Sequence, residues 1–369
     1  MDIVETSQHS LLPHFSEFLA QRIGLYFPPE RGCDLLRGIE AAAREFGFQD
    51  AAACMQWLLS TPLDRNRIEI LACHLTVGET YFFRDPQIFE ALKARILPVL
   101  IQFRRQCGPT LRIWSAGCAT GEEAYSLAIL VQRMIPDFRQ WHITILGTDI
   151  NPHALAKAES GSYGEWSFRN APDWLKNGYF RPTEKGRYEI IPSVREMVTF
   201  AYLNLMEDSY PSLINNTNAM DIIFCRNVLM YFEPAPATQV VRRYCLSLVD
   251  GGWLVISPTE GYRIMTETME MVNFPGAILY RKNISGATPS PAEPFLARPE
   301  PPEQIIIGPV AATKRPTRRP ELMAVEKRRL HRDSRIIGRL SPSTNKGAMA
   351  KRQCKPSRFC PAGKTRYRR

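Results

Sequence analysis

The stretch WSAGCATGEEAYSLAILV, residues 114–131, runs from an apolar segment through two glycines into two adjacent glutamates and an amphipathic pattern. The apolar residues before Gly117 are typical of a strand, and those after Gly121 recur at the helical spacing of three and four. Ligands of α/β proteins bind at the carboxyl ends of parallel strands, where glycine lets the backbone approach them closely. The stretch therefore predicts a strand, a ligand-binding loop over 115–121 and a helix that buries Ala124, Leu127, Ala128 and Val131.

The same alternation of strand and helix extends on both sides of this loop. Alternating elements predict an α/β protein with a doubly wound, mostly parallel sheet and helices on both of its faces. The predicted strands span 111–116, 142–149, 197–205, 221–227, 252–257 and 277–283, and the predicted helices span 122–135, 151–160 and 234–249.

Residues 10–80 carry a different pattern, with apolar sets at helical spacing separated by turn-forming stretches. They predict an N-terminal all-α domain over residues 1–80, followed by the α/β domain over residues 81–284. The apolar sets are Phe15, Phe18, Leu19 and Ile23; Leu35, Ile39, Ala43 and Phe46; Ala52, Met55 and Leu59; and Ile68, Leu71 and Leu75.

Charge divides the chain at residue 285. The net charge is +10, but residues 285–369 carry 20 Lys and Arg against 6 Asp and Glu, which leaves residues 1–284 at −4. Repeated prolines in the first part of this segment block helix continuation and leave little apolar surface to bury. We expect a Pro-rich linker and a disordered basic tail, either merely solvated or weakly attracted to an acidic partner such as nucleic acid or anionic lipid.

Composition narrows the class of protein further. No run of about 18 apolar residues is present to span a bilayer, and the N-terminus lacks the basic and apolar regions of a secretion signal, so a cytoplasmic location is expected. The cysteines number 9, which is odd, and no C-x-x-C pair occurs. The 6 histidines show no H-x-x-x-H spacing. Neither a disulfide framework nor a metal site is therefore predicted.

Two adjacent acids restrict the ligand of the glycine loop. A dinucleotide loop reads G-x-G-x-x-G and places a pyrophosphate on the helix N-terminus. This loop instead reads Gly117-Cys-Ala-Thr-Gly121 and continues with Glu122 and Glu123. Because two carboxylates would repel a phosphate, the loop favours a ligand that carries positive charge and no phosphate.

A third acid, Asp149, ends the next predicted strand, 32 residues after Gly117. There a carboxylate can accept hydrogen bonds from both hydroxyls of a ribose. A glycine turn at 250–252 then precedes a late strand. The three features in this order resemble the S-adenosylmethionine (SAM) methyltransferase fold, and SAM fits the electrostatics because its ammonium and sulfonium are cationic.

Longer strings make the resemblance more specific. It extends from about residue 10 to 283 and is to the chemotaxis-receptor glutamate methyltransferases, the CheR family. It implies a protein-glutamate O-methyltransferase that transfers the SAM methyl group to glutamate side chains of methyl-accepting chemoreceptors for sensory adaptation. The matching strings are TVGETYFFRDP at 76–86, WSAGCATGEEAYSLA at 114–128, GTDIN at 147–151, LNL at 203–205 and DIIFCRNVLMYF at 221–232.

The resemblance also implies a role for each matching position. Arg84 and Tyr231 would lie at the methyl-transfer site, where the permanently charged Arg84 guanidinium could orient the substrate glutamate or hold the SAM carboxyl group. Glu122 is not carried over and is expected to face solvent or the helix dipole. The positions implied to bind SAM are Gly78, Thr80, Arg84, Gly117, Glu123, Asp149, Asn204, Leu205, Asn227 and Val228.

The implied chemistry asks little of the protein's own acids and bases. A glutamate substrate is already ionised at neutral pH, so its oxygen needs no general base to attack the methyl group. Catalysis would then depend on alignment and on a pocket that removes water from the carboxylate.

Three features depart from the family pattern or extend it. Position 78 is glycine where many members have a polar residue, so one SAM contact is expected to come from backbone or water. Residues 163–198 resemble a small inserted antiparallel β-subdomain, which in some members docks a receptor peptide by adding a strand. Between residues 30 and 50 the arginines are Arg31, Arg37 and Arg44, fewer than family members often use to face acidic receptor helices.

The implied partners are the cytoplasmic helical domain of the receptors and a methylesterase that reverses the modification. Two other functions stay open on sequence alone. One is a non-catalytic adaptor that binds SAM within a signalling array. The other is a nucleic-acid methyltransferase, which the basic tail favours but the acidic body and the string FCRNV, in place of N-P-P-Y/F, do not.

Overall fold

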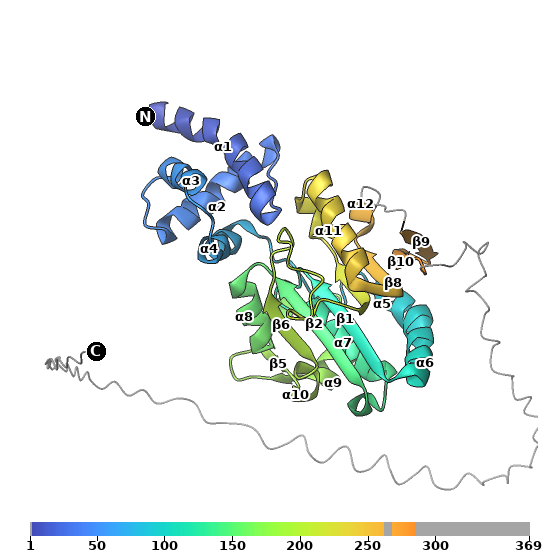
Figure 1. Ribbon diagram of the computed structural model, residues 1–369. Helices are drawn as coiled ribbons and strands as arrows, with labels where there is room; N and C mark the ends of the chain where they lie inside the picture. The colour runs from blue at the N-terminus through green and yellow to red at the C-terminus, as the bar shows by residue number, and fades with distance from the viewer. Residues whose placement is uncertain (1, 262–267, 285–369) are drawn as a thin grey trace, which may run out of the picture. The chain divides into compact units, whose positions relative to one another are not determined.

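The computed structural model describes residues 2–261 and 268–284 (Figure 1). Its first four helices pack around a hydrophobic core of their own, in which Phe15, Ile39, Met55 and Leu71 are fully buried. The apolar sets predicted from the sequence form the inner faces of these helices. The helices are α1 (Asp2–Ile23), α2 (Gly32–Glu45), α3 (Ala51–Ser60) and α4 (Arg65–Leu75), with a 3-10 turn at Pro29–Arg31.

Two aspartates begin the third and fourth of these helices. The Asp50 carboxylate accepts a hydrogen bond from the Ala53 N–H at 2.9 Å, and the Asp64 carboxylate accepts one from the Arg67 N–H at 2.9 Å. Each side chain satisfies an N–H that lacks a partner within its helix, which is why the helices start there.

A seven-stranded sheet with the order β6-β2-β1-β7-β8-β10-β9 forms the second part of the fold. The first five strands run parallel, and β10 pairs antiparallel with both β8 and β9. The predicted doubly wound α/β fold is confirmed. The strands are β1 (Thr110–Ala116), β2 (His142–Asp149), β6 (Val198–Tyr202), β7 (Met220–Cys225), β8 (Leu248–Ile256), β9 (Met269–Phe274) and β10 (Ala277–Lys282).

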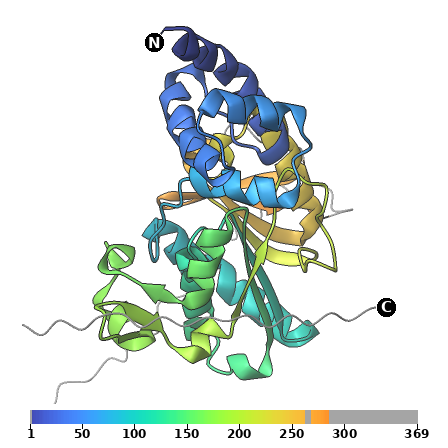
Figure 2. The same cartoon turned by 90° about the vertical axis from the view of Figure 1, so that its left-hand side faces the viewer.

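Helices cover both faces of this sheet (Figures 1 and 2). In the central strand β7, Ile222 and Phe224 join the core beneath α6 and α7, whereas Ile223 and Cys225 join the core beneath α11. Successive side chains of a strand point to opposite faces, so residues 222–225, which are buried on both sides of the sheet, are all apolar. The helices are α5 (Pro86–Ala91), α6 (Leu97–Cys107), α7 (Glu122–Met134), α8 (Pro152–Ser160), α11 (Pro234–Ser247) and α12 (Pro258–Gly261), with a π-helical turn at Leu92–Ile96 and 3-10 turns at Phe138–Gln140 and Leu229–Tyr231.

A small antiparallel sheet with the order β3-β5-β4 is inserted between α8 and β6, as predicted. Its aromatic core includes Phe82, whose ring stacks on Phe168 at 5.1 Å and meets Tyr163 edge-on at 4.9 Å. Phe82 therefore anchors the segment that carries Arg84. The inserted elements are β3 (Ser162–Tyr163), a 3-10 turn (Glu165–Phe168), α9 (Asp173–Tyr179), β4 (Phe180–Pro182), β5 (Tyr188–Ile190) and α10 (Pro192–Arg195).

The predicted linker and basic tail, 285–369, lie outside the described residues. Of the helices in the part that is described, none combines the length and the apolar character needed to cross a membrane.

Candidate functional site

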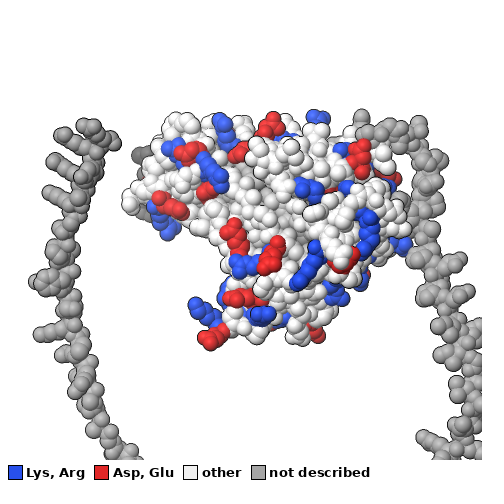
Figure 3. Space-filling model, turned by 60° about the horizontal axis from the view of Figure 1, so that its bottom comes forward, with Lys and Arg blue, Asp and Glu red and all other residues white. Residues whose placement is uncertain are grey.

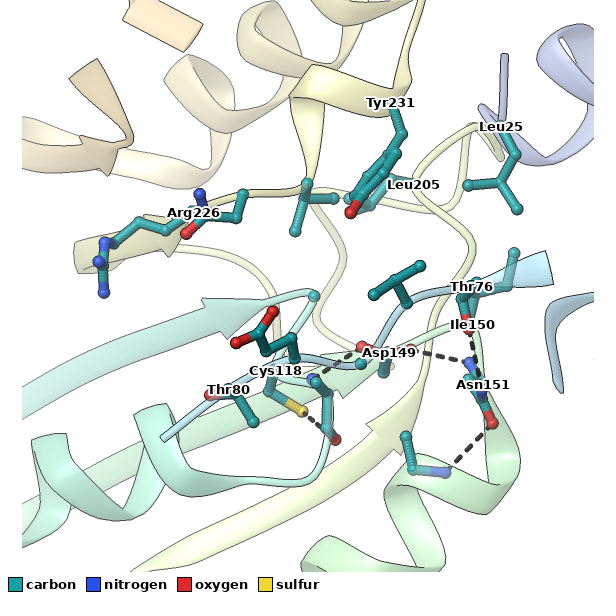
Figure 4. Close-up of a pocket in the computed structure, with 18 of the residues that line it drawn as sticks. Leu25, Thr76, Thr80, Cys118, Asp149, Ile150, Asn151, Leu205, Arg226 and Tyr231 are labelled. Atoms are coloured by element: carbon teal, nitrogen blue, oxygen red, sulfur yellow. Dashed lines mark hydrogen bonds between the residues drawn. The ribbon is translucent and has the colours of Figure 1, made fainter. Parts of the chain in front are cut away.

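One pocket lies at the carboxyl ends of β1, β2 and β7 (Figure 4). Segments far apart in the sequence line it, and the first of them, residues 23–31, comes from the N-terminal helical part of the chain. All positions that the sequence analysis assigned to SAM or to methyl transfer line this pocket: Gly78, Thr80, Arg84, Gly117, Glu123, Asp149, Asn204, Leu205, Asn227, Val228 and Tyr231.

The glycine loop is held close to the neighbouring strand and to the opposite wall. The N–H groups of Gly117 and Cys118 both donate to the Thr148 carbonyl, at 2.8 and 2.9 Å. Gly117 has a φ of +77°, and a Cβ at this position would lie 2.4 Å from the Val228 side chain. Glycine is required here both for the left-handed backbone and for the close approach of the two walls.

Asp149 lies beside this loop, across the pocket from Tyr231 and Leu205 (Figure 4). Its carboxylate accepts hydrogen bonds from the N–H groups of Ala119 at 2.8 Å and Asn151 at 2.9 Å. Burial raises the pKa of Asp149, and these backbone N–H groups partly oppose that shift. A carboxylate offers about four acceptor sites, so capacity for two ribose hydroxyls is left.

Glu123 forms the acidic wall at the start of α7. Its carboxylate accepts a hydrogen bond from the Ser115 hydroxyl at 2.7 Å and pairs with Arg226 at 3.2 Å. Burial raises the pKa of Glu123, while the Arg226 charge and the Ser115 hydrogen bond lower it. The carboxylate therefore faces the pocket with Arg226 paired to it and the charge of Arg84 nearby, and a cationic ammonium group could add to this arrangement.

Arg226 is a pocket residue that the sequence analysis missed. Its side chain is 1% exposed and pairs with both Glu123 and Asp85. Its Nε is buried and has no hydrogen-bond partner among the described residues. The feature of the sequence that could have revealed Arg226 is its position as a charged residue directly after the apolar strand residues 222–225.

Glu122 does not face solvent, so that part of the expectation was wrong; the helix dipole was the other setting expected for it. The residue is 1% exposed, and its carboxylate accepts hydrogen bonds from the hydroxyls of Thr120 at 2.6 Å and Ser167 at 2.8 Å. Ser167 belongs to the inserted subdomain, which covers the start of α7. Glu122 is thus buried and Glu123 is partly buried, on different sides of one helix terminus, where the helix dipole favours negative charge.

Arg84 retains hydrogen-bonding capacity at the edge of the pocket. One of its Nη atoms donates to the Glu79 carbonyl at 2.8 Å, and the guanidinium lies 5.7 Å from the centre of the Tyr81 ring. That carbonyl is the only hydrogen-bond partner found for Arg84 within residues 2–261 and 268–284. Arginine has five N–H donors, so donors remain for a carboxylate.

Gly78 and Thr80 precede Arg84 on the same segment. A Cβ at Gly78 would meet only the Ala119 side chain, at 3.9 Å, which is an ordinary contact. Crowding therefore does not demand glycine at this position, in contrast to Gly117. The Thr80 carbonyl accepts a long hydrogen bond from Arg169 at 3.5 Å.

The side-chain amide of Asn204 is already used within the protein. It donates to the Arg22 carbonyl at 2.9 Å and accepts from the Met206 N–H at 3.0 Å. Asn204 therefore ties this wall to the end of α1, and the neighbouring Leu205, which is 7% exposed, supplies apolar surface to the pocket.

Tyr231 meets the N-terminal helical part of the chain. Its carbonyl accepts a hydrogen bond from the Tyr26 N–H at 2.8 Å, and the Arg31 guanidinium lies 5.8 Å from the centre of its ring. Neither Tyr26 nor Arg31 was predicted to line the pocket, because both come from outside the α/β pattern that marked it.

The chemistry of this pocket fits SAM. Glu123 and Asp149 can face an ammonium group and a ribose, Leu205 offers an apolar surface, and the close backbone at Gly117 leaves no room for a side chain. Among the described residues, no group of three or more His, Cys, Asp or Glu could hold a metal ion.

Comparison with known proteins agrees with this assignment. Residues 78–278 match the family described as CheR methyltransferase, SAM binding domain. Chemotaxis protein methyltransferase 2 of Vibrio cholerae is 32% identical over 276 residues, covering 74% of this chain and 92% of that protein. Chemotaxis protein methyltransferase 1 of Pseudomonas aeruginosa is 34% identical over 222 residues, covering 58% and 77%. The chain belongs to the CheR family of SAM-dependent methyltransferases.

Proposed function

We propose that this protein transfers the SAM methyl group to glutamate side-chain carboxylates of chemoreceptors, and so serves sensory adaptation. The observation that carries the proposal is the charge layout of the pocket, which places two carboxylates along one wall and the free donors of Arg84 at its edge. The names of the relatives, chemotaxis protein methyltransferases, support a receptor as the substrate.

The cofactor side of the reaction is assigned to the glycine loop and its acids. SAM supplies an electrophilic methyl group when it is bound. Asp149 would accept hydrogen bonds from the ribose hydroxyls of SAM, and Glu123 would face its ammonium group. Because Arg226 and the Ser115 hydroxyl stabilise the charged form of Glu123, this carboxylate can stay ionised despite its burial.

The substrate side is assigned to Arg84 and Tyr231. Arg84 orients the incoming carboxylate through the two parallel hydrogen bonds that a guanidinium can form. Tyr231 limits the space beside it and excludes water. No histidine lines the described part of the pocket, and none is required because a glutamate is ionised at neutral pH. Alignment and removal of water supply the rate enhancement.

Methyl-labelled SAM and receptor-containing membranes test the proposal. The labelled product is treated with mild alkali, and volatile methanol is collected. Label that alkali releases from a receptor-sized band identifies a carboxyl methyl ester. The Asp149→Ala variant should give no label. Asp137→Ala, which removes an exposed carboxylate paired with Arg105, should label as the wild type does.

The same experiment separates the rival functions. Alkali-stable label on nucleic acid would identify a nucleic-acid methyltransferase, and SAM binding without turnover would identify a signalling adaptor. On the face shown in Figure 3, Lys and Arg side chains lie among Asp and Glu side chains and form no separate basic field. That face therefore offers no basic field for a phosphate backbone.

Adaptation requires that the methyl group can be removed. We therefore propose that the protein works opposite a methylesterase that acts on the same receptors. Receptors labelled as above should release labelled methanol when that esterase is added. Label that persists on the receptors would contradict a role in reversible adaptation.

A further inference from the structure

The loop that carries Asn227, Val228 and Tyr231 is folded around a buried carboxylate that belongs to a different element. This carboxylate is Glu260, in the short helix α12 that follows β8. The residue is 3% exposed. Its sequence context, SPTEG, carries none of the motifs that marked the pocket.

Each carboxylate oxygen of Glu260 accepts hydrogen bonds from two backbone N–H groups. One oxygen accepts from Val228 at 2.9 Å and Met230 at 3.0 Å, and the other accepts from Asn227 at 3.1 Å and Ser257 at 2.9 Å. Three of these donors, Asn227, Val228 and Met230, belong to the pocket loop itself and fall within four consecutive positions, 227–230. Consecutive backbone N–H groups that converge on one anion form a concave binding site, here filled by the protein's own side chain.

This arrangement holds the backbone in an uncommon conformation. Asn227 has a φ of +58°, in the left-handed region. The turn that follows brings Val228 so close to Gly117 that a Cβ on Gly117 would lie 2.4 Å from the Val228 side chain. The same turn places Tyr231 beside the N-terminal segment. The carboxylate thus sets the distance between the two walls of the SAM pocket.

We propose that Glu260 is a positioning residue for SAM binding, which acts by holding the loop 227–231 against the glycine loop. It does not itself line the pocket. Its loss should therefore weaken SAM binding in folded protein, and this effect is separable from any loss of stability. The inference concerns the cofactor and stands whether or not a receptor glutamate is the substrate.

The test compares two buried carboxylates that serve the two ends of β7. Asp221 lies in β7 near its amino end, is 1% exposed, and accepts hydrogen bonds from the Arg112 N–H at 2.8 Å and from Arg104 at 3.0 Å. Glu260→Gln and Asp221→Asn each replace such a carboxylate by an amide of the same shape. Titration calorimetry of the full-length variants with SAM, well below the Tm of each, measures the Kd of the folded protein.

Glu260→Gln should raise the Kd for SAM by about tenfold or more, because an amide nitrogen would face loop N–H groups that need an acceptor. Asp221→Asn should lower the Tm but change the Kd by less than about twofold. A Glu260→Gln protein that loses Tm as Asp221→Asn does, yet binds SAM as tightly as the wild type, would overturn the proposal.

A second measurement needs no variant. In the wild-type protein without SAM, the amides of Asn227, Val228 and Met230 should be protected from hydrogen exchange, since the carboxylate already binds them. If these amides exchange as fast as those of an open loop, Glu260 does not hold the loop, and the inference fails even where Glu260→Gln cannot be purified in folded form.

Discussion

At the scale of single residues, Asp149 connects the glycine loop to the end of β2 through its hydrogen bonds with Ala119 and Asn151. Asp149→Asn puts an amide nitrogen against one of these N–H groups and weakens the acceptors left for a ribose. Hydrogen bonds to charged groups contribute about 1.5–3 kcal/mol, so we expect the Kd for SAM to rise about tenfold to a hundredfold. Calorimetry measures it, with Asp137→Asn as the matched exposed carboxylate, and equal Kd values for the two variants would contradict the assignment.

The buried acids also predict a pH dependence. Burial raises the pKa of Asp149 and Glu123 above their ordinary values of 3.8 and 4.5. A raised carboxyl pKa means that the folded chain binds the proton more tightly than the unfolded chain. The stability from these groups is therefore fully present below the ordinary pKa and is lost as the pH rises through the raised pKa.

SAM should oppose this tighter proton binding, because a cationic ligand favours the ionised form of both carboxylates. We expect the rise in Tm that SAM causes to shrink as the pH falls through the raised pKa values of the two carboxyl groups. Thermal unfolding with and without SAM across this range measures the effect. Asp149→Asn should flatten part of the dependence, and a SAM-induced Tm shift that is constant with pH would show that neither acid faces the cofactor.

Substitution of Arg84 should affect receptor methylation and SAM binding to different extents. Arg84→Lys keeps the charge but loses the two parallel hydrogen bonds, and Arg84→Ala loses both. If Arg84 orients the substrate carboxylate, kcat/KM for receptor methylation should fall about tenfold in Arg84→Lys and about a hundredfold in Arg84→Ala, while the Kd for SAM stays within about threefold of the wild type. A large rise in that Kd would instead place Arg84 on the SAM carboxyl group. Arg105→Ala removes an exposed arginine paired with Asp137 and is the control.

At the scale of elements, the glycine loop and the loop after β7 act as one clamp. Gly117→Ala would place a methyl group 2.4 Å from Val228, at a φ of +77°. Gly47 has a similar φ of +85° but no atom within 4 Å of the position of a Cβ. Both variants suffer the backbone cost of about 1–2 kcal/mol, but only Gly117→Ala must push the walls apart. We expect Gly117→Ala to abolish measurable SAM binding and Gly47→Ala to leave the Kd unchanged; similar Kd values would show that the clamp yields freely.

How far the sequence predicts an element depends on how far apart in the chain its contacts are. The inner face of α7 and the ends of β1 and β2 were predicted, because local periodicity and turn residues determine them. The burial of Glu122 was not, since it depends on Ser167, which is 45 residues away. Glu260 lies 33 residues from Asn227 and left no pattern at all.

The edge strand β9 shows a second reason for a missed element. It was not predicted, although the neighbouring β10 was. Several of its side chains are exposed, and its burial follows no strict alternation. An edge strand pairs on one side only, so less of its surface must be apolar and its pattern is weaker.

At the scale of the whole molecule, the pocket belongs to two parts of the chain. The Asn204 amide reaches the Arg22 carbonyl, 182 residues away, and a Cβ on Gly24 would lie 2.3 Å from the Phe232 ring. The helical part therefore closes the pocket. Periodicity reveals each part separately, but nothing in either pattern shows that residues 23–31 form a wall for the cofactor.

The basic segment 285–369 differs in charge from the rest of the chain. Its 20 Lys and Arg against 6 Asp and Glu contrast with a body of net charge −4, while every residue that lines the described pocket precedes position 233. Deleting 285–369 should therefore leave the Kd for SAM and the Tm unchanged but weaken association with an acidic partner, and more so at low salt because exposed charges are less screened there. Co-sedimentation with receptor-containing membranes at two ionic strengths measures this. A variant with Lys and Arg of the segment replaced by Gln separates charge from length: if it sediments as the wild type does, charge is not what the tail contributes.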